Sequence, residues 1–157
     1  MGDNTASLIL KEPNLWLGGD YAAASSQFFK TKKIQAVLNC TPEIPNYFCS
    51  KGVEYARISL GDSRDKSDMD AMRNLLEFAA EWIHVHRDLY KKVIYVHCNQ
   101  GINRSATCLA AYMIKYKGMS LDDVKKLYSI SRQAAFYHGA YATFDPILKE
   151  WERKYYK

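Results

Sequence analysis

A cysteine and an arginine stand six residues apart in the segment His97-Cys98-Asn99-Gln100-Gly101-Ile102-Asn103-Arg104-Ser105. A short loop that runs into a helix turns its backbone N–H groups inward, and with the helix macrodipole these groups form a cradle for an anion. The cradle and Arg104 favour the thiolate of Cys98, which makes this sulfur a nucleophile at neutral pH. Gly101 permits a turn that a Cβ atom would block. We therefore expect a phosphate-binding loop formed by Asn99, Gln100, Gly101, Ile102, Asn103 and Arg104.

The planar fork of Arg104 suits two phosphoryl oxygens, both in binding and as charge shifts during phosphoryl transfer. In the competing interpretation Cys98 is a small buried core residue and Arg104 is a solvated helix start. The Cys-x5-Arg-Ser spacing between an apolar strand and an apolar helix favours the chemical interpretation.

The elements around this loop are those of an α/β protein. Val93–Val96 is a β-branched, mostly apolar run without alternation, which predicts a central parallel strand buried on both faces. Arg104–Lys117 is an apolar helix that Gly118 closes in the left-handed conformation. In open α/β sheets ligands bind beyond the carboxyl ends of the strands, where this loop lies.

The rest of the chain alternates strands and helices, which predicts a mostly parallel central sheet of about five strands flanked by helices. We expect a hairpin, two further strands and four further helices. The hairpin pairs Leu8–Leu10 with Leu15–Leu17, and the strands are Ile34–Asn39 and Val53–Leu60. The helices are Ala22–Lys30 after a cap at Asp20, one capped by Ser67 with an apolar face that includes Ile83, one opened by Ser120, and Ala140–Tyr156 interrupted or offset at Pro146.

Composition narrows the class of protein. A chain of 157 residues is of single-domain size, so we expect one domain over residues 1–157. The net charge of +5 favours anionic partners, but no run of five like charges marks a nucleic-acid arm, so nucleic acid is not expected as a partner. The four cysteines have neither disulfide-framework nor metal-knuckle spacing. We expect no metal and no cofactor.

Sequence patterns also indicate the compartment. The longest nearly apolar stretch, Thr107–Ile114, is far short of the ~20 residues that a membrane span needs. The segment Met1–Leu10 lacks the basic and then apolar layout of a signal peptide. We expect a cytoplasmic protein with access to the nucleus, and we expect it to be a monomer.

The segment from His97 to Ser105 is similar to the HCxxGxxR[ST] signature of the cysteine-dependent protein tyrosine phosphatases. Further matches resemble the dual-specificity branch of that family, and the resemblance covers roughly residues 8 to 151. These matches are Arg104-Ser105-Ala106-Thr107, Ala111-Tyr112-Met113-Ile114, Ala36-Val37-Leu38-Asn39 and Leu15-Trp16-Leu17-Gly18. The resemblance implies a metal-free phosphatase that acts on phosphorylated proteins. It implies hydrolysis of phosphotyrosine and of phosphoserine or phosphothreonine through a phosphocysteine intermediate.

The resemblance also implies roles for single residues. Asp62 would be the general acid that protonates the leaving oxygen and then activates water, with Asp65 as the alternative. Ser105 would donate a hydrogen bond to the cysteine sulfur and ease breakdown of the phosphocysteine. His97 would orient the loop. The catalytic set is therefore Cys98, Arg104, Asp62 and Ser105.

The chain departs from the dual-specificity pattern at three places, one of which is Gln100, where Ala is frequent. Ser63 stands where many members carry an Asn just after the acid, and Ser131-Arg132-Gln133-Ala134 stands where they carry Pro-Asn. That Asn braces the phosphate loop in the family. Two other functions stay open: an RNA 5′-triphosphatase, because Gly101-Ile102-Asn103-Arg104 resembles its GxNR, and a non-catalytic phosphoprotein-binding module. A phosphoinositide phosphatase is disfavoured because the loop carries no lysine.

An accessible thiolate at Cys98 would be oxidised to sulfenic acid more readily than the other cysteines. Cys40 ends the Ile34–Asn39 strand, and if that strand lies beside Val93–Val96, both thiols lie at the same edge of the sheet. Cys40 is thus the candidate redox partner of Cys98, and Cys49 is the second choice. In the competing interpretation Cys40 only packs in the core.

Overall fold

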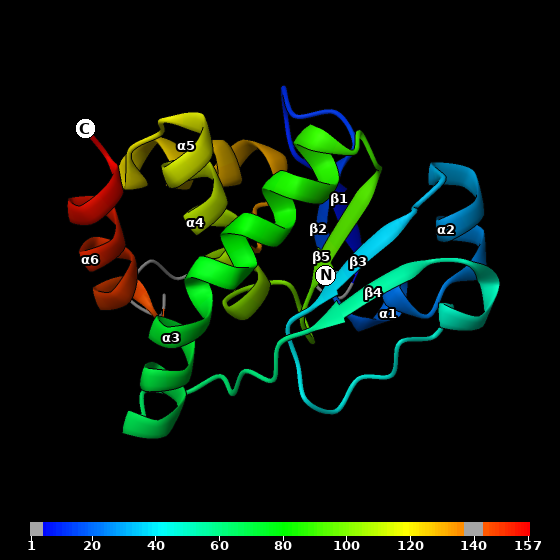
Figure 1. Ribbon diagram of the computed structural model, residues 1–157, viewed down its shortest axis with the longest axis horizontal. Helices are drawn as coiled ribbons and strands as arrows, with labels where there is room; N and C mark the ends of the chain where they lie inside the picture. Colours follow the sequence, from blue (N-terminus) through cyan, green and yellow to red (C-terminus); the bar gives the residue numbers. More distant parts are fainter. Residues whose placement is uncertain (1–4, 137–142) are drawn as a thin grey trace.

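A five-stranded sheet runs through the middle of the molecule in the order β1-β2-β5-β3-β4 (Figure 1). The computed structural model describes residues 5–136 and 143–157. The β1 strand pairs antiparallel with β2 and the other pairings are parallel. The strands are β1 (Ala6–Leu8), β2 (Leu15–Gly18), β3 (Ala36–Asn39), β4 (Glu54–Arg57) and β5 (Ile94–His97). The mostly parallel sheet with the Val93–Val96 strand at its centre is confirmed.

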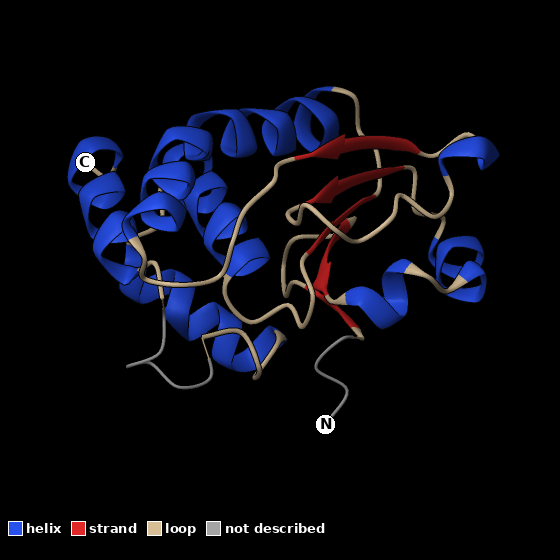
Figure 2. Cartoon of the chain, turned by 90° about the horizontal axis from the view of Figure 1, so that it is seen from below, coloured by secondary structure: helices blue, strands red, loops and turns tan. Residues whose placement is uncertain are grey.

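Helices cover both faces of this sheet. Figure 2 shows the sheet with two short helices on one side and the long helices on the other. The short pair is α1 (Asp20–Ala23) and α2 (Ser26–Lys32), and the long set is α3 (Lys66–Ile83), α4 (Arg104–Lys117), α5 (Leu121–Ser131) and α6 (Asp145–Tyr155). The chain also contains a short 3-10 helix, η1 (Cys49–Lys51), and a π-helical segment, η2 (His84–Leu89).

Side chains on the central strands alternate between two separate cores. Val37 and Tyr95 pack with Phe29 of α2 on one face. Leu38 and Val96 pack on the other face with the long helices. Because β3 and β5 are buried on both faces, their sequences show no polar alternation. The predicted loop begins at the end of β5, one of these doubly buried strands.

The α4 helix is held from every side. Its first eleven residues, Arg104 to Ile114, are all buried. The hydroxyl of Tyr128 on α5 donates to the carbonyl oxygen of Ala106 at 2.7 Å, and the indole N–H of Trp151 on α6 donates to that of Ala111 at 3.0 Å. The helix ends at Gly118 with φ +69°, as the sequence predicts. The residues that start α4 therefore have a rigid support.

Several predicted boundaries are wrong, for local reasons. The first strand is Ala6–Leu8 rather than Leu8–Leu10, since Ala6 pairs with Gly18 and Leu10 is exposed. The predicted helix Ala22–Lys30 is two helices, because the Ser25 side chain accepts from the N–H of Phe28 and starts a new one. The predicted cap at Asp20 is wrong, since α1 begins at Asp20 itself, after Gly19 at the N-cap position. The strands expected over 34–39 and 53–60 span four residues each.

The predicted cap at Ser67 is wrong, and the predicted cap at Ser120 is confirmed. Ser67 is not a cap: α3 begins earlier, with Asp65 at the N-cap position and no side-chain capping bond. Ser120 does cap α5, accepting from the N–H of Asp123 at 3.1 Å. The expected start of the last helix at Ala140 lies outside the described residues, and α6 begins at Asp145 with Pro146 in its first turn.

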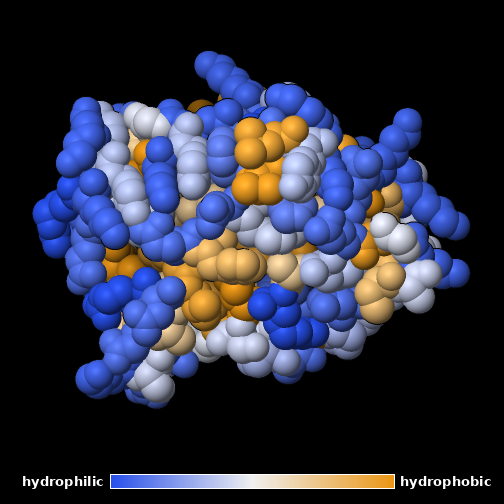
Figure 3. Space-filling model, in the orientation of Figure 1, coloured by the Kyte–Doolittle hydropathy of each residue, from blue (hydrophilic) through white to orange (hydrophobic). Residues whose placement is uncertain are grey.

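The face drawn in Figure 3 is hydrophilic over most of its area, with small separate hydrophobic areas. The exposed large apolar residues come from different elements, including Tyr21 in α1, Phe78 in α3 and Ile130 in α5. In residues 5–136 and 143–157, no helix is long and apolar enough to cross a membrane.

Candidate active site

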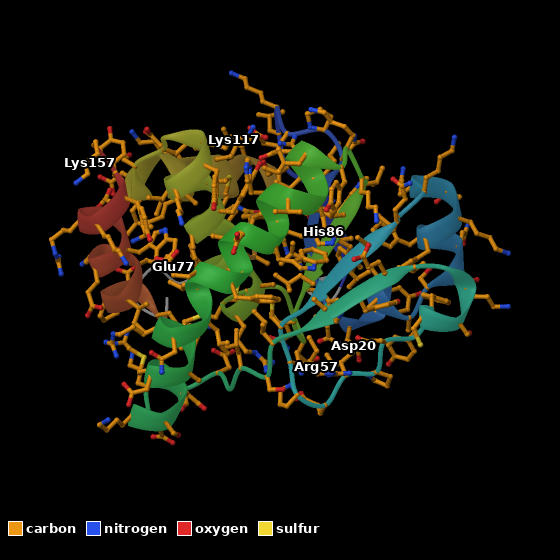
Figure 4. All side chains as sticks on the ribbon, in the orientation of Figure 1. Asp20, Arg57, Glu77, His86, Lys117 and Lys157 are labelled. Carbon is orange, nitrogen blue, oxygen red and sulfur yellow. The ribbon has the colours of Figure 1, made fainter. Side chains whose placement is uncertain are left out.

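The segment that follows β5 lies between the ends of two neighbouring strands. His97, the last residue of β5, stands opposite Gly18 of β2 and Asn39 of β3. The next N–H, that of Cys98, donates to the carbonyl oxygen of Gly18 at 3.3 Å. Asp20 comes shortly after β2, and Arg57 is the last residue of β4. Both lie at this same edge of the sheet (Figure 4). The loop therefore lies at the carboxyl edge, where the sequence places it.

The carbonyl groups of this loop all have partners outside it. The oxygen of Asn99 accepts from the N–H of Asp20 at 2.8 Å, and that of Ile102 accepts from the N–H of Phe136 at 3.1 Å. Between them, the oxygens of Gln100 and Gly101 accept from the guanidinium of Arg132 at 2.8 and 3.1 Å. The loop carbonyls thus point outward, away from the centre of the turn.

The N–H groups of the same peptides point the opposite way. Among the described residues, those of Asn99 to Asn103 donate to no other protein group. Gly101 has φ +70°, and a Cβ there would lie 2.6 Å from the backbone of Gly18, so the turn requires glycine. A row of inward N–H groups at the start of a helix is an anion-binding arrangement.

Cys98 and Ser105 face each other at the base of this cradle. The Cys98 sulfur lies 3.2 Å from the Ser105 hydroxyl oxygen, and both residues are buried. A hydroxyl beside a thiolate donates its hydrogen to the sulfur. The structure therefore brings together the predicted nucleophile and the residue expected to stabilise it.

Arg104 is buried, with an exposed fraction of 7%, at the first position of α4. Its Nη1 donates to the carbonyl oxygen of Leu60 at 2.8 Å. Its Nε is buried and has no hydrogen-bond partner among the described residues. A guanidinium with an unsatisfied N–H in an N–H-lined cradle suits a further anionic acceptor.

The bond from Arg104 to Leu60 also fixes the segment that carries Asp62. Within this segment the Ser63 hydroxyl donates to the carboxylate of Asp68 at 2.6 Å and accepts from the N–H of Asp65 at 3.1 Å. Ser63, a departure from the family pattern, thus stabilises the turn before α3. In the described part of the chain the exposed Asp62 carboxylate has no hydrogen bond or ion pair.

Asp65, the alternative acid, occupies a different position. It is the N-cap residue of α3, and its carbonyl oxygen accepts from the N–H of Met69 at 2.9 Å. Asp62 is closer in sequence to Leu60, which contacts Arg104 directly. Asp62 therefore stays the proposed acid, with Asp65 as the alternative.

His97 is completely buried and stacks on Tyr95 with ring centroids 5.3 Å apart. Its Nδ1 donates to the carbonyl oxygen of Cys98 at 3.2 Å, whereas its Nε2 has no partner among the described residues. The pKa of His97 is lowered to about 4, chiefly by burial; the bond to Cys98 opposes this shift, and the charges of Arg57 and Arg104 contribute to it. His97 is therefore neutral near pH 7 and holds the first peptide of the loop.

Cys40 lies beside Cys98 at the same edge of the sheet. The N–H of Cys40 donates to the carbonyl oxygen of His97 at 2.8 Å, and both thiols belong to the same core. Burial raises the pKa of Cys40 well above its usual value, and Cys108 of α4 and Cys98 raise it further. The expected juxtaposition is present, with Cys108 as an additional thiol beside Cys40.

Cys49, the second choice, lies elsewhere. It is exposed in η1 and lies near Tyr55, which packs on the face of the sheet opposite the core that contains Cys98. Within the described ranges, no group of three His, Cys, Asp or Glu side chains is arranged to hold a metal ion.

Sequence reasoning missed four groups that shape the loop. These are the Arg132 side chain, the N–H groups of Asp20 and Phe136, and the carbonyl group of Leu60. A backbone group has no sequence signal of its own. Arg132 did have one, since it stands in the segment where the expected Pro-Asn is absent.

A family model described as "Dual specificity phosphatase, catalytic domain" matches residues 15–154. Human "Dual specificity protein phosphatase 21" is 31% identical over 110 residues, which are 70% of this chain and 55% of that protein. Human "Dual specificity protein phosphatase 4" is 34% identical over 111 residues, 71% of this chain and 27% of that protein. The match thus spans about half or less of these curated relatives.

Solved structures show the same fold. Human DUSP28 superposes with a TM-score of 0.80 at 20% identity, covering 95% of this chain and 93% of that one. A mouse putative dual specificity phosphatase complexed with zinc tungstate gives 0.78 at 22%, covering 96% and 88%. Human tyrosine phosphatase-like serine/threonine/tyrosine-interacting protein gives 0.75 at 19%, covering 95% and 96%. The catalytic-domain model covers most of the chain, and the chain therefore belongs to the dual specificity phosphatase catalytic-domain family.

Proposed function

We propose that this protein hydrolyses phosphotyrosine and phosphoserine or phosphothreonine in phosphorylated proteins, through a phosphocysteine intermediate and without a metal. The observation that carries the proposal is the loop from Cys98 to Arg104, in which the carbonyl groups bond outward and the N–H groups of Asn99 to Asn103 have no partner among the described residues. The membership of the family supports the reaction class.

The first step transfers the phosphoryl group to the protein. The thiolate of Cys98 attacks phosphorus, the bond to the substrate oxygen breaks, and that oxygen takes a proton from Asp62. The loop N–H groups and the Arg104 guanidinium bind the non-bridging oxygens, where charge develops in the transition state. Asn99 and Gln100 are exposed and uncharged, so they form a polar rim that accepts more than one phosphorylated side chain.

The second step returns the thiolate. Asp62, now a carboxylate, takes a proton from a water molecule whose oxygen attacks phosphorus, and the sulfur–phosphorus bond breaks. The Ser105 hydroxyl, 3.2 Å from the sulfur, donates a hydrogen bond that stabilises the departing thiolate. Inorganic phosphate leaves and the next cycle begins.

We infer three wider properties. Residues 1–157 act as one catalytic domain, because a single sheet and two continuous cores join the described elements.

The free thiols of all four cysteines favour the cytoplasm, with access to the nucleus. Scattered exposed apolar residues favour a monomer, which sedimentation at several protein concentrations tests.

The test of the proposed function is Cys98→Ser, with Cys49→Ser as a matched control on an exposed cysteine. We expect Cys98→Ser to lower kcat for phosphotyrosine and phosphothreonine peptides by about 10³-fold or more, because the nucleophile is lost. Tungstate, measured by calorimetry, should still bind since the N–H cradle and Arg104 remain. Cys49→Ser should match the parent, and a chelator should not reduce turnover.

Residual turnover above a few per cent in Cys98→Ser would contradict the mechanism. Phosphopeptide binding without turnover in the parent would identify a phosphoprotein-binding module. Preferential release of phosphate from 5′-triphosphorylated RNA, independent of Asp62, would identify an RNA 5′-triphosphatase.

A further inference from the structure

A second arginine lies behind the phosphate loop, and the proposed chemistry makes no use of it. Arg132 is the residue that ends α5, and only 4% of its surface is exposed. A buried guanidinium has a large desolvation cost, so it persists where hydrogen bonds satisfy it. The burial of Arg132 therefore depends on its hydrogen-bond partners.

The hydrogen bonds of Arg132 join the end of α5 to two other segments, the phosphate loop and β1. Its Nη2 donates to the carbonyl oxygen of Gln100 at 2.8 Å and its Nε donates to that of Gly101 at 3.1 Å. Its Nη1 donates to the hydroxyl of Ser7 in β1 at 3.1 Å. The fork thus holds two consecutive loop peptides and ties them to the edge strand.

We propose that Arg132 is the positioning residue of the phosphate loop, holding the Gln100 and Gly101 peptides so that the N–H groups of Gly101 and Ile102 face the substrate phosphoryl group. The N–H of a peptide points opposite to its carbonyl group, so fixing a carbonyl outward fixes the following N–H inward. The neighbouring peptides are held by backbone N–H groups of Asp20 and Phe136. Arg132 serves the two peptides that have no backbone partner in the described part of the chain.

The guanidinium suits this place for a geometric reason. Gly101 has φ +70° and no Cβ, and a Cβ there would lie 2.8 Å from Nη2 of Arg132. The glycine thus gives the guanidinium access to the backbone. A fixed positive charge behind the loop also adds to the attraction for a phosphate dianion. A lysine, with one compact charge, could not donate to both carbonyls from one plane.

The effect on turnover rests on the proposed function, so the test measures oxyanion binding separately. We expect Arg132→Met to weaken tungstate binding, measured by calorimetry, and to lower kcat/KM for p-nitrophenyl phosphate, each by about 10- to 100-fold. Arg132→Lys keeps the charge and should recover part of both. Arg153→Gln, an arginine in the last turn of α6, is the control and should match the parent. Each protein is assayed well below its own Tm.

The outcomes separate the two proposals. An Arg132→Met protein that keeps tungstate affinity and kcat/KM within about two-fold overturns the role of Arg132 and leaves the phosphatase function standing. A parent that binds tungstate without turnover, with weaker binding in Arg132→Met, overturns the function and supports Arg132. If Arg132→Met does not fold, Arg132→Lys decides, and parental tungstate affinity in that variant overturns the proposal.

Discussion

At the scale of single residues, Asp62 carries the most testable role. Its exposed carboxylate follows Leu60, whose carbonyl oxygen accepts from Arg104 at 2.8 Å, so it lies on a segment fixed beside the loop. We expect Asp62→Asn to slow hydrolysis of phosphoserine peptides by ~10²–10⁴-fold. Aryl esters with good leaving groups should be slowed much less, because their oxygen departs without a proton.

The measurement compares kcat for phosphoserine peptide and for an aryl phosphate in Asp62→Asn and Asp65→Asn. Equal slowing of both substrates, or a larger effect of Asp65→Asn, would transfer the role away from Asp62.

Cys40 supports a second prediction at this scale. Peroxide oxidises the Cys98 thiolate to a sulfenic acid; the Cys40 thiolate then attacks this sulfur, forms the disulfide and releases hydroxide. Because burial raises the pKa of Cys40, its thiolate is scarce at pH 7 and more abundant at pH 9. Disulfide formation should therefore accelerate as pH rises over this range, measured by mass spectrometry after peroxide treatment.

Reducing agent should then restore activity in the parent and not in Cys40→Ser, whose Cys98 oxidises further. Cys49→Ser serves as the control. Equal recovery in the parent and in Cys40→Ser would leave Cys40 as a packing residue, whereas loss of recovery in Cys108→Ser would assign the pairing to the neighbouring thiol.

At the scale of elements, one carboxylate joins three helices. Glu77 lies on the side of α3 that faces α6 (Figure 4). Its carboxylate accepts from Lys115 of α4 at 3.0 Å and from Lys154 and Tyr155 of α6. Burial raises the pKa of Glu77, but these hydrogen bonds outweigh it and lower the pKa to about 2. The carboxylate is half exposed, so solvent and salt weaken its ion pairs.

We expect Glu77→Gln to lower the free energy of unfolding by about 1 kcal/mol at pH 7, measured by urea denaturation. The difference should shrink as pH falls from 4.5 towards 2, because a carboxylate with a lowered pKa stabilises the fold only while it is ionised. Glu81→Gln, an exposed carboxylate on the same helix, is the control. An equal effect of both changes would show that the three-helix contact contributes nothing.

At the scale of the whole molecule, the buried His97 links stability to pH. The pKa of His97 is 6.5 in an unfolded chain and about 4 in the folded one. Between these values the unfolded state binds one more proton, so the free energy of unfolding rises with pH from 4 to 6.5 and falls on acidification. The loss on moving from pH 7 to pH 4 is up to about 3 kcal/mol.

We expect His97→Gln to have a shallower acid dependence than the parent, measured by urea denaturation at pH 4.5, 5.5 and 7. The ring protons of His97 should show no NMR titration between pH 5.5 and 8. A titration midpoint near 6.5 in the folded protein would contradict this account.

The sequence alone was sufficient for the features that are local. The loop from His97 to Ser105, the central strand before it and the helix after it lie in one contiguous stretch, so residue types and spacing predict them. The close of α4 at Gly118 and the cap at Ser120 are also local, since a cap depends on a few neighbouring backbone groups. Elsewhere the observed ends of helices and strands differ from the predicted ends by several residues, because strand pairing and capping set the observed ends.

Tertiary structure alone decided which distant groups meet the loop. The Arg132 side chain lies thirty-one positions after Gly101, and Leu60 lies forty-four before Arg104, yet both bond to it directly. The neighbour of Cys40 is Cys108 as well as Cys98, because α4 packs on the sheet behind both strands. Hydrophobic periodicity reports which face of an element is buried, whereas partner choice depends on the relative placement of whole elements, which no local spacing encodes.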